Sequence, residues 1–222
     1  VVAEFPRSKK LIKYPRVAMT ANSSGGYVAS ASSVYNASHA NQEWEAFDNV
    51  IDPDGSGTDS WDSLSNAFGS SGTPRTPTGT AATFDDEAGE WLNIRLPEKI
   101  ILYEYEHITR ANRTHEGPHS GFLYGSNDGF TTYDKIHTFS AINLSTRASY
   151  VHAVNTVKSY NEYRLHVTRV QGSPYLNISN FDLYGVPEYD PEAYGTDVTV
   201  KSLPNVPNTD WLEVYYDAKN YT

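Results

Sequence analysis

Apolar and polar residues alternate along much of this chain, and the alternation recurs in four separate segments. Side chains at every second position of a β-strand point to the same face, so a period of two predicts strands with one buried face. The side chains that we expect to face the core are Leu92, Ile94 and Leu96; Ile101, Tyr103 and Tyr105; Val151, Ala153 and Val157; and Tyr163, Leu165 and Val167. Many short strands separated by turn residues are typical of a β-sandwich or jelly roll.

Two other patterns interrupt the strands. Ala40, Trp44, Phe47 and Ile51 are spaced as one apolar face of a helix, so we predict a short helix within residues 39–51. The segment LNISNFDLYG changes the parity of its apolar positions at its middle, which predicts a β-bulge there.

The same patterns divide the chain into three parts. Residues 1–26 are expected to form a basic N-terminal arm, residues 27–185 the β-sandwich, and residues 186–222 an acidic linker with the start of a further β segment. Prolines in the arm discourage a helix. The arm is therefore either a solvated tail or a strap that lies on a neighbouring subunit of a larger assembly.

Composition narrows the class of protein. The 222 residues suffice for one full core, the mean hydropathy is −0.56, and no apolar run reaches the ~20 residues that span a bilayer. The net charge of −10 argues against nucleic acid as the main partner. The absence of cysteine excludes disulfides and cysteine-bound zinc. We therefore expect no membrane span and no nucleic-acid partner.

Four fragments stand in a fixed order along the chain. They are AFDN with TDSW in residues 46–61, GEWLNIRLPEKI in 89–100, LYGSNDGF in 123–130, and YRLHVTRVQGSPYLNISNFDLYG in 163–185. Together they resemble the discoidin family, also called F5/8 type C domains or family 32 carbohydrate-binding modules. The resemblance implies an all-β, galactose-binding-like jelly-roll sandwich with ligand loops at one end, here with extended N- and C-terminal arms. It also implies a recognition module, because domains of this family are not usually catalysts.

The loop that begins in the AFDN fragment is rich in side-chain oxygens. Calcium prefers several carboxylate, hydroxyl and carbonyl oxygens on a tight, glycine-bearing loop. The resemblance implies a structural Ca²⁺ here, whose expected ligands are Asp48, Asp52, Asp54, Asp59, Ser60 and Asn180. Asn180 stands where the family typically has Glu, so one negative charge is lost. The alternative is an acidic surface loop that binds no metal.

A second polar segment, residues 107–121, lies between two predicted strands. Sugar sites need forked hydrogen-bonding groups for hydroxyls and an aromatic face for the apolar side of the ring. The segment offers Arg110, Asn112, Arg113, His115 and His119, and the aromatic face would come from Trp44, Trp61 or Tyr175. A binding loop is not needed for folding, so we expect Arg110 and Arg113 to be exposed and dispensable for stability. A polar solvated loop without a ligand is the alternative.

Enzyme activity is not indicated. The sequence has no GxSxG motif, and Gly117 and Pro118 between His115 and His119 prevent the helix that would align this pair on a metal. The favoured function is non-catalytic recognition of a glycan or cell-surface ligand, at an extracellular location or on a virion surface. The alternative is a structural component of a large assembly, such as a viral capsid, fibre or spike protein, with neighbouring subunits as partners.

Overall fold

The computed structural model describes residues 10–35, 41–51, 59–110, 113–140 and 149–188. Within these residues the elements are almost all strands. They are β1 (Ile12–Tyr14), β2 (Ser23–Ser24), β3 (Tyr27–Ala31), η1 (Glu43–Phe47), β4 (Trp61–Asp62), β5 (Ala82–Phe84), β6 (Glu87–Ile108), η2 (Thr114–Glu116), β7 (Pro118–Ser126), β8 (Asp134–Phe139), β9 (Ser149–Ala153), β10 (Ser159–Val170), β11 (Asn177–Ile178) and β12 (Asn180–Pro187). Both η elements are short 3₁₀ helices.

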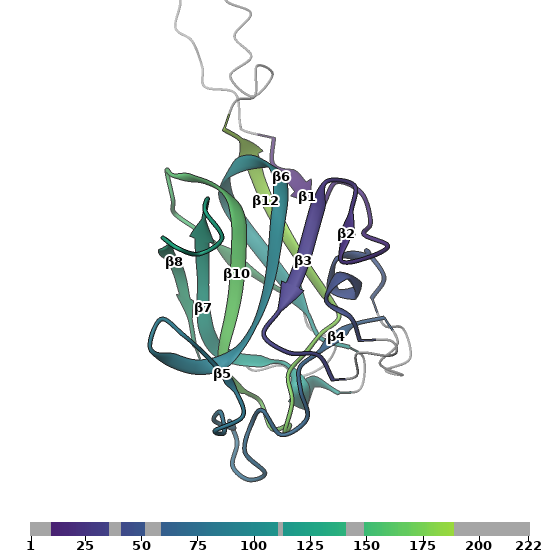
Figure 1. Ribbon diagram of the computed structural model, residues 1–222, viewed down its shortest axis with the longest axis vertical. Coiled ribbons are helices and arrows are strands. Elements are labelled where there is room, and N and C mark those ends of the chain that lie inside the picture. The colour runs from purple at the N-terminus through teal and green to yellow at the C-terminus, as the bar shows by residue number, and fades with distance from the viewer. Residues whose placement is uncertain (1–9, 36–40, 52–58, 111–112, 141–148, 189–222) are drawn as a thin grey trace, which may run out of the picture. The chain divides into compact units, whose positions relative to one another are not determined.

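The long strand β6 joins two antiparallel layers (Figure 1). Its first half pairs with β3 and β10, and β10 continues this layer to β7 and β8. Its second half pairs with β12 and β9, and β12 continues the second layer to β1. The register of β6 against β10 is interrupted between Arg95 and Ile100. Pro97 lies in this interruption, where a missing N–H does least harm to a sheet. The expected all-β sandwich is confirmed.

The core lies where the alternation of apolar residues in β6 and β10 predicts it. Leu92, Ile94 and Leu96 are buried, as are the inward side chains of β10, Tyr163, Leu165 and Val167. The second half of β6 differs from expectation, because Ile100 and Leu102 are fully buried in place of Ile101 and Tyr103. Tyr184 pairs with Glu104 and Gly185 with Leu102, so Tyr103 is an extra residue in the ladder and shifts the parity.

The expected parity of β9 is wrong. Val151 and Val157 are 57% and 87% exposed, and Ala153 is exposed as well. Tyr150 and His152 face the interior instead, where His152 stacks on Tyr105 with ring centroids 4.6 Å apart. Large rings fill the space at this edge of the sandwich better than valine does, and their polar atoms find partners there.

The predicted N-terminal arm is partly wrong. Ile12–Tyr14 pairs with β12, Tyr14 is fully buried, and Lys13 forms an ion pair with Asp182 (2.8 Å). Ser23–Ser24 pairs with β3. The sandwich therefore includes a segment that the sequence assigned to the arm, because its few apolar residues complete the second layer. The arm before Lys10 and the linker after Glu188 lie outside the described residues.

Two further expectations change. The predicted helix in 39–51 is a 3₁₀ helix of five residues, Glu43–Phe47, and Phe47 packs on Phe181 with ring centroids 5.8 Å apart. The parity change near the C-terminal end is a strand break rather than a bulge. Asn177–Ile178 pairs with β4 in a small separate sheet, whereas Asn180 begins β12 in the main sheet.

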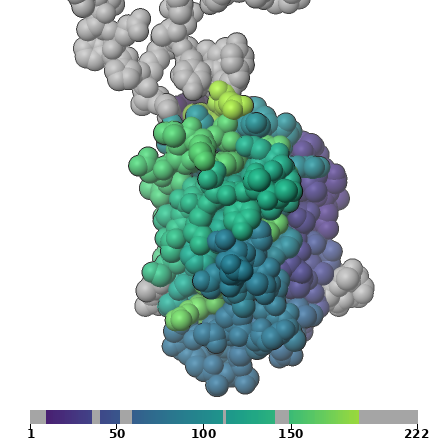
Figure 2. Space-filling model, turned by 60° about the vertical axis from the view of Figure 1, so that its left-hand side comes forward, coloured from purple at the N-terminus to yellow at the C-terminus, as the bar shows by residue number. Residues whose placement is uncertain are grey.

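The β5–β6 hairpin folds over the outer face of the first layer. Its turn residues Asp85 and Asp86 have φ angles of 54° and 61°, and Asp85 accepts hydrogen bonds from Tyr124 and Tyr133. In Figure 2 the blue surface that includes this hairpin lies against the teal and green surface of β7 and β8. Beneath the hairpin, the Arg164 guanidinium lies over the ring of Phe130, 3.9 Å from its centroid.

Candidate functional site

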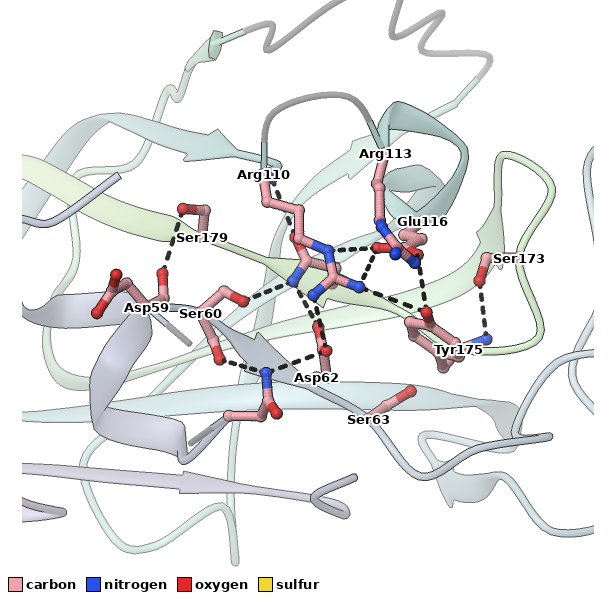
Figure 3. A network of polar contacts seen from close by, with 12 residues as sticks. Asp59, Ser60, Asp62, Ser63, Arg110, Arg113, Glu116, Ser173, Tyr175 and Ser179 are labelled. Carbon is pink, nitrogen blue, oxygen red and sulfur yellow. Dashed lines mark hydrogen bonds and ion pairs between the residues drawn. The ribbon is translucent and has the colours of Figure 1, made fainter. Parts of the chain in front are cut away.

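A buried arginine organises one end of the sandwich (Figure 3). Arg110 lies two residues after the end of β6, and its backbone N–H donates to Asn177 Oδ1 (3.1 Å). Its guanidinium donates to Glu116 Oε2 (2.6 Å) and to Asp62 Oδ2 (3.3 Å). Arg110 is only 4% exposed. The residue therefore acts as an internal ion-pair partner, which contradicts the expectation that it is exposed.

The two carboxylates are held by several donors each. Glu116 lies on η2 and also accepts from the Tyr175 hydroxyl (2.8 Å) and from Arg113 (3.3 Å). Asp62 lies on β4 and accepts from Asn177, which β11 places opposite it. We call Asp62, Arg110, Glu116 and Tyr175 the arginine network. A buried charge is tolerated only when it is paired and hydrogen-bonded, so each member depends on the others.

Short local elements position these side chains. The 3₁₀ turn of η2 closes with a hydrogen bond from Gly117 N to Thr114 O (3.1 Å) and turns Glu116 inward. The two-residue ladder between β4 and β11 brings Asp62 beside the loop that contains Tyr175. These elements are far apart in the chain, and only the sandwich brings them to the same end.

The solvent side of the arginine network is an exposed rim. The side chains of Arg113 and His115 are 48% and 56% exposed, and Tyr35 is 49% exposed. Tyr35 and Tyr175 lie with their ring centroids 5.7 Å apart and their planes at 52°. Burial, followed by the hydrogen bond to Glu116, raises the pKa of Tyr175, so its hydroxyl stays a donor. We call Tyr35, Arg113, His115 and Tyr175 the tyrosine–arginine rim.

The structure brings together only part of the predicted ligand set. Arg110, Arg113 and His115 belong to one site, and Asn112 lies outside the described residues. His119 lies on β7, where its Nδ1 contacts Ser120 Oγ (2.8 Å). Burial and then the charge of Arg169 lower its pKa. His119 has no contact with the arginine network among the described side chains.

The predicted tryptophans are not at the rim. Trp61 is fully buried and its indole N–H donates to Ser33 O (2.9 Å), so it cannot stack on a ligand, which corrects the expectation. Trp44 is partly buried and packs against the core. The aromatic face comes from Tyr175, which the sequence offered, and from Tyr35, which it did not. Tyr35 has no signal of its own because it follows β3 in an ordinary polar loop.

The structure describes only part of the predicted calcium ligand set. Asp52 and Asp54 lie outside the described residues. Asp48 ends η1, and burial, followed by repulsion from Asp59, raises its pKa to about 6. Ser60 is buried and its Oγ accepts from Asn177, which joins it to the arginine network.

Asn180 offers a buried oxygen. Its Nδ2 donates to Asp182 (2.6 Å), whereas its Oδ1 has no hydrogen-bond partner within the described part of the chain. The preceding residue, Ser179, donates to the backbone oxygen of Asp59 (3.4 Å). A hard cation takes oxygen donors of these kinds, so the residues fit calcium chemically. Among the described residues, no group of three or more His, Cys, Asp or Glu side chains could hold a metal ion.

A surface cavity of about 610 Å³ lies at the opposite end of the sandwich, where β7 ends and β10 begins. Its polar lining groups largely satisfy one another. Asp134 accepts from Lys158 (3.0 Å) and Tyr160 (2.7 Å), and Glu188 accepts from Ser159 (2.5 Å). We therefore assign the candidate site to the tyrosine–arginine rim rather than to this cavity.

No helix in the described residues has the length and apolar character needed to span a membrane.

Comparison with known proteins identifies the fold. No family model and no curated protein matches the sequence. The structure is similar to a family 32 carbohydrate-binding module from Clostridium perfringens, solved in complex with GalNAc-β-1,3-galactose, with a TM-score of 0.52 and 12% identity over 72% of this chain and 95% of that chain. It is similar to the F5/8 type C domain of a Bacteroides fragilis protein, with a TM-score of 0.52 and 15% identity over 72% of this chain and 91% of that chain.

A third neighbour is a fucolectin from striped bass (Morone saxatilis) serum, with a TM-score of 0.52 and 12% identity over 72% of this chain and 47% of that chain. At these identities the likeness establishes the fold alone. It confirms the discoidin-like sandwich that the ordered fragments implied.

Proposed function

We propose that this protein is a non-catalytic glycan-recognition module that binds its ligand at the tyrosine–arginine rim. The observation that carries the proposal is the arrangement of this rim over the arginine network. Exposed hydrogen-bonding groups and two tyrosine rings stand at one end of the sandwich, on a buried scaffold that fixes their positions. Preorganised groups on a rigid frame are what a specific polar ligand requires.

The chemistry of the rim suits a sugar. Arg113 offers planar forked donors, and His115 offers a further ring nitrogen, which together can bond adjacent hydroxyl groups. Tyr35 and Tyr175 offer aromatic surface for the apolar face of a pyranose ring. The neighbour in complex with a disaccharide and the neighbour that is a fucolectin add support at the level of the fold.

The same arrangement argues against catalysis. The carboxylates that pair with Arg110 under the rim are Asp62 and Glu116, and Glu116 is fully buried while Asp62 is 3% exposed. Both are occupied by Arg110, so neither can reach a scissile bond as an acid or base. An extracellular location belongs to this proposal.

The experiment is a glycan-array screen, followed by calorimetric titration of the best glycan into the wild type and two variants. Arg113→Ala should weaken binding by ~10- to 100-fold, since a hydrogen bond to a charged group contributes roughly 1.5–3 kcal/mol. Tyr35→Ala should also weaken it, since the substitution removes aromatic surface that packs on the sugar ring. Arg95→Ala is the matched control, because Arg95 is exposed on β6 in a strand of the sheet. Equal affinity of all four proteins would contradict the rim as the site, and the absence of any bound glycan would contradict the function.

A structural Ca²⁺ is a second part of the proposal. Asp48 and the amide oxygen of Asn180 would contribute to its coordination, and the ion would neutralise the carboxylate of Asp48, whose pKa burial raises. If the ion binds only the folded protein, its removal costs ~2.7 kcal/mol at a hundredfold excess over Kd. EDTA should lower the Tm, added Ca²⁺ but not Mg²⁺ should restore it, and Asp48→Ala should abolish the response. A Tm that EDTA leaves unchanged would contradict the proposed Ca²⁺ site.

The alternative role, a structural component of a viral capsid, fibre or spike, stays a prediction. Residues 1–9 of its proposed strap, the N-terminal arm, lie outside the described residues.

A further inference from the structure

Three histidines from three strands meet at the lateral edge of the sandwich. His107 lies on β6, His137 on β8 and His152 on β9. The ring centroids of His107 and His152 are 5.2 Å apart, and those of His137 and His152 are 5.3 Å apart. We call them the histidine cluster. They share no residue with the tyrosine–arginine rim.

The contact between His107 and His152 requires that at least one of the two rings is neutral. His107 Nε2 and His152 Nε2 are 3.2 Å apart. Two imidazoles can form this hydrogen bond only when one nitrogen carries a proton and the other presents a lone pair. A proton taken up by the accepting nitrogen would turn it into a second donor, and two N–H groups would then face each other. His137 Nδ1 contacts the Tyr105 hydroxyl (2.9 Å).

The surroundings of the cluster are aromatic. Tyr105 stacks on His152 with planes 20° apart, and Tyr150 stacks on His107 with planes 16° apart. Phe139 lies within 5.4 Å of the His152 ring, between centroids. His107 is fully buried. An imidazolium formed here would lose its hydration without gaining a polar environment.

No carboxylate compensates for such a charge among the described residues of the strands that pack around the cluster. On β6, the carboxylates of Glu104 and Glu106 interact electrostatically with Tyr184, on the other face of the sheet. On β12, Asp182 pairs with Lys13, and on β8, Asp134 pairs with Lys158. The remaining charged group of β8, Lys135, pairs with Asp85. The sequence of β9 contains no acid, and neither do residues 141–148.

The pKa directions agree with this arrangement. Burial, followed by repulsion from His152, lowers the pKa of His107 to about 3. Burial, followed by repulsion from His137, lowers the pKa of His152 to about 4. The ordinary value of histidine is about 6.5. Because the folded values are lower, the cluster stabilises the fold fully above the ordinary value, and this contribution is lost as the pH falls toward the folded values.

Strand β9 is the element that this loss would release. Within the described residues it pairs only with β6, and its outward residue Val151 is 57% exposed. Elements with few neighbours open at a lower free energy than central strands. The inward side chains Tyr150 and His152 attach it to the sandwich through the ring contacts described above.

We propose that the histidine cluster is an acid-sensitive latch, whose protonation releases β9 from the sandwich and uncovers the core beside Tyr105 and Phe139. The device couples the exposure of an apolar surface to the pH of the surroundings. It operates below neutral pH, and its opening equilibrium rises by up to tenfold per pH unit for each histidine that takes up a proton.

The test is amide hydrogen exchange at pH 7.5 and 5.0, with each rate corrected for its intrinsic pH dependence. The opening equilibrium of residues 149–153 should rise at least tenfold more than that of the β10 amides. His152→Phe keeps a ring on Tyr105 but cannot take up a proton, so it should remove most of this difference. His152→Gln serves if the phenylalanine variant does not fold. His115→Gln is the control, because His115 is exposed at the tyrosine–arginine rim and is not part of the cluster, and it should respond to acid as the wild type does.

Three outcomes would overturn the latch. In one, β9 and β10 lose protection together at pH 5.0, which means ordinary global acid unfolding. In another, the variant without His152 keeps the full acid response of β9. In the third, Zn²⁺ at pH 7.5 raises the protection of β9 in the wild type but not in the variant, which would make the cluster a metal site.

Discussion

Two buried polar clusters of this sandwich solve the same physical problem in opposite ways. At the loop end, the arginine network keeps its charges and pairs them, since Arg110 lies between Glu116 and Asp62. At the lateral edge, the histidine cluster is uncharged, and its neutral rings contact one another and their aromatic neighbours. A paired cluster is fragile to substitution, because removing one partner leaves a buried charge. A neutral cluster is destabilised by protonation, because a bound proton creates a buried charge.

The largest expected effect is on the arginine network. Arg110→Ala should lower the free energy of unfolding by ~3–5 kcal/mol, because it leaves Glu116 and Asp62 buried without their cation. Urea denaturation monitored by tryptophan fluorescence measures this. Arg95→Ala, an exposed arginine, should change it by less than ~0.5 kcal/mol. A loss under ~1 kcal/mol for Arg110→Ala would mean that the network is not a charge-paired scaffold.

The second effect separates the clusters by pH. Between pH 7 and pH 5 the stability should fall by ~1–2 kcal/mol for each of His107 and His152, because their folded pKa values are about 3 and about 4 and the pH falls below the ordinary value. Unfolding curves at the two pH values measure the loss. The loss should be smaller in His152→Phe, whereas Arg113→Ala should show the wild-type loss. An unchanged pH dependence in His152→Phe would remove the contrast between the clusters.

A smaller effect tests the partners of Glu116 one at a time. Tyr175→Phe removes one donor to this buried carboxylate (2.8 Å) and leaves Arg110 in place, so stability should fall by ~1 kcal/mol. Tyr133→Phe is the matched control. It loses a hydroxyl that donates to Asp85 (3.1 Å) at an exposed position, so its cost should be a few tenths of a kcal/mol. Equal costs would show that burial adds nothing to the network.

The smallest stability effect belongs to the residue expected to matter most for binding. Arg113 has a side chain that is 48% exposed, and Glu116 keeps Arg110 and Tyr175 when Arg113 is removed. Arg113→Ala should therefore change the free energy of unfolding by less than ~0.5 kcal/mol while weakening glycan binding. Thermal unfolding beside calorimetric titration separates the two readouts. A large stability loss would place Arg113 in the scaffold instead of the rim.

The sequence was a good guide where alternation is strong and locally consistent. Leu92, Ile94 and Leu96 are aliphatic at every second position, and the structure buries all three. The segment SYVHAVNTV also alternates, yet Val151 and Val157 are exposed, because Tyr150 and His152 have ring partners on β6. A period of two identifies two faces without saying which face the neighbouring strand will cover.

The candidate site was predicted by residue type and only in part. Arg110, Arg113 and His115 were selected because they are hydrogen-bonding residues in a loop between strands. Their different roles, one buried and two exposed, depend on Glu116 and on Asp62, which no local pattern connects to them. Tyr35 was missed because nothing in its own segment indicates that Tyr175 lies beside it.

The sequence by itself determined the class of fold, the two best strands of the core and the loop that holds the site. The tertiary structure alone decided which polar residues are scaffold and which are free to meet a ligand. The reason is that side-chain alternation is carried by residues two positions apart. The partner of a buried charge is brought there by strands dozens of residues away, as Asp62, Arg110 and Asn177 are. The histidine cluster is such a case too, since only the closing of the two layers places His107, His137 and His152 together.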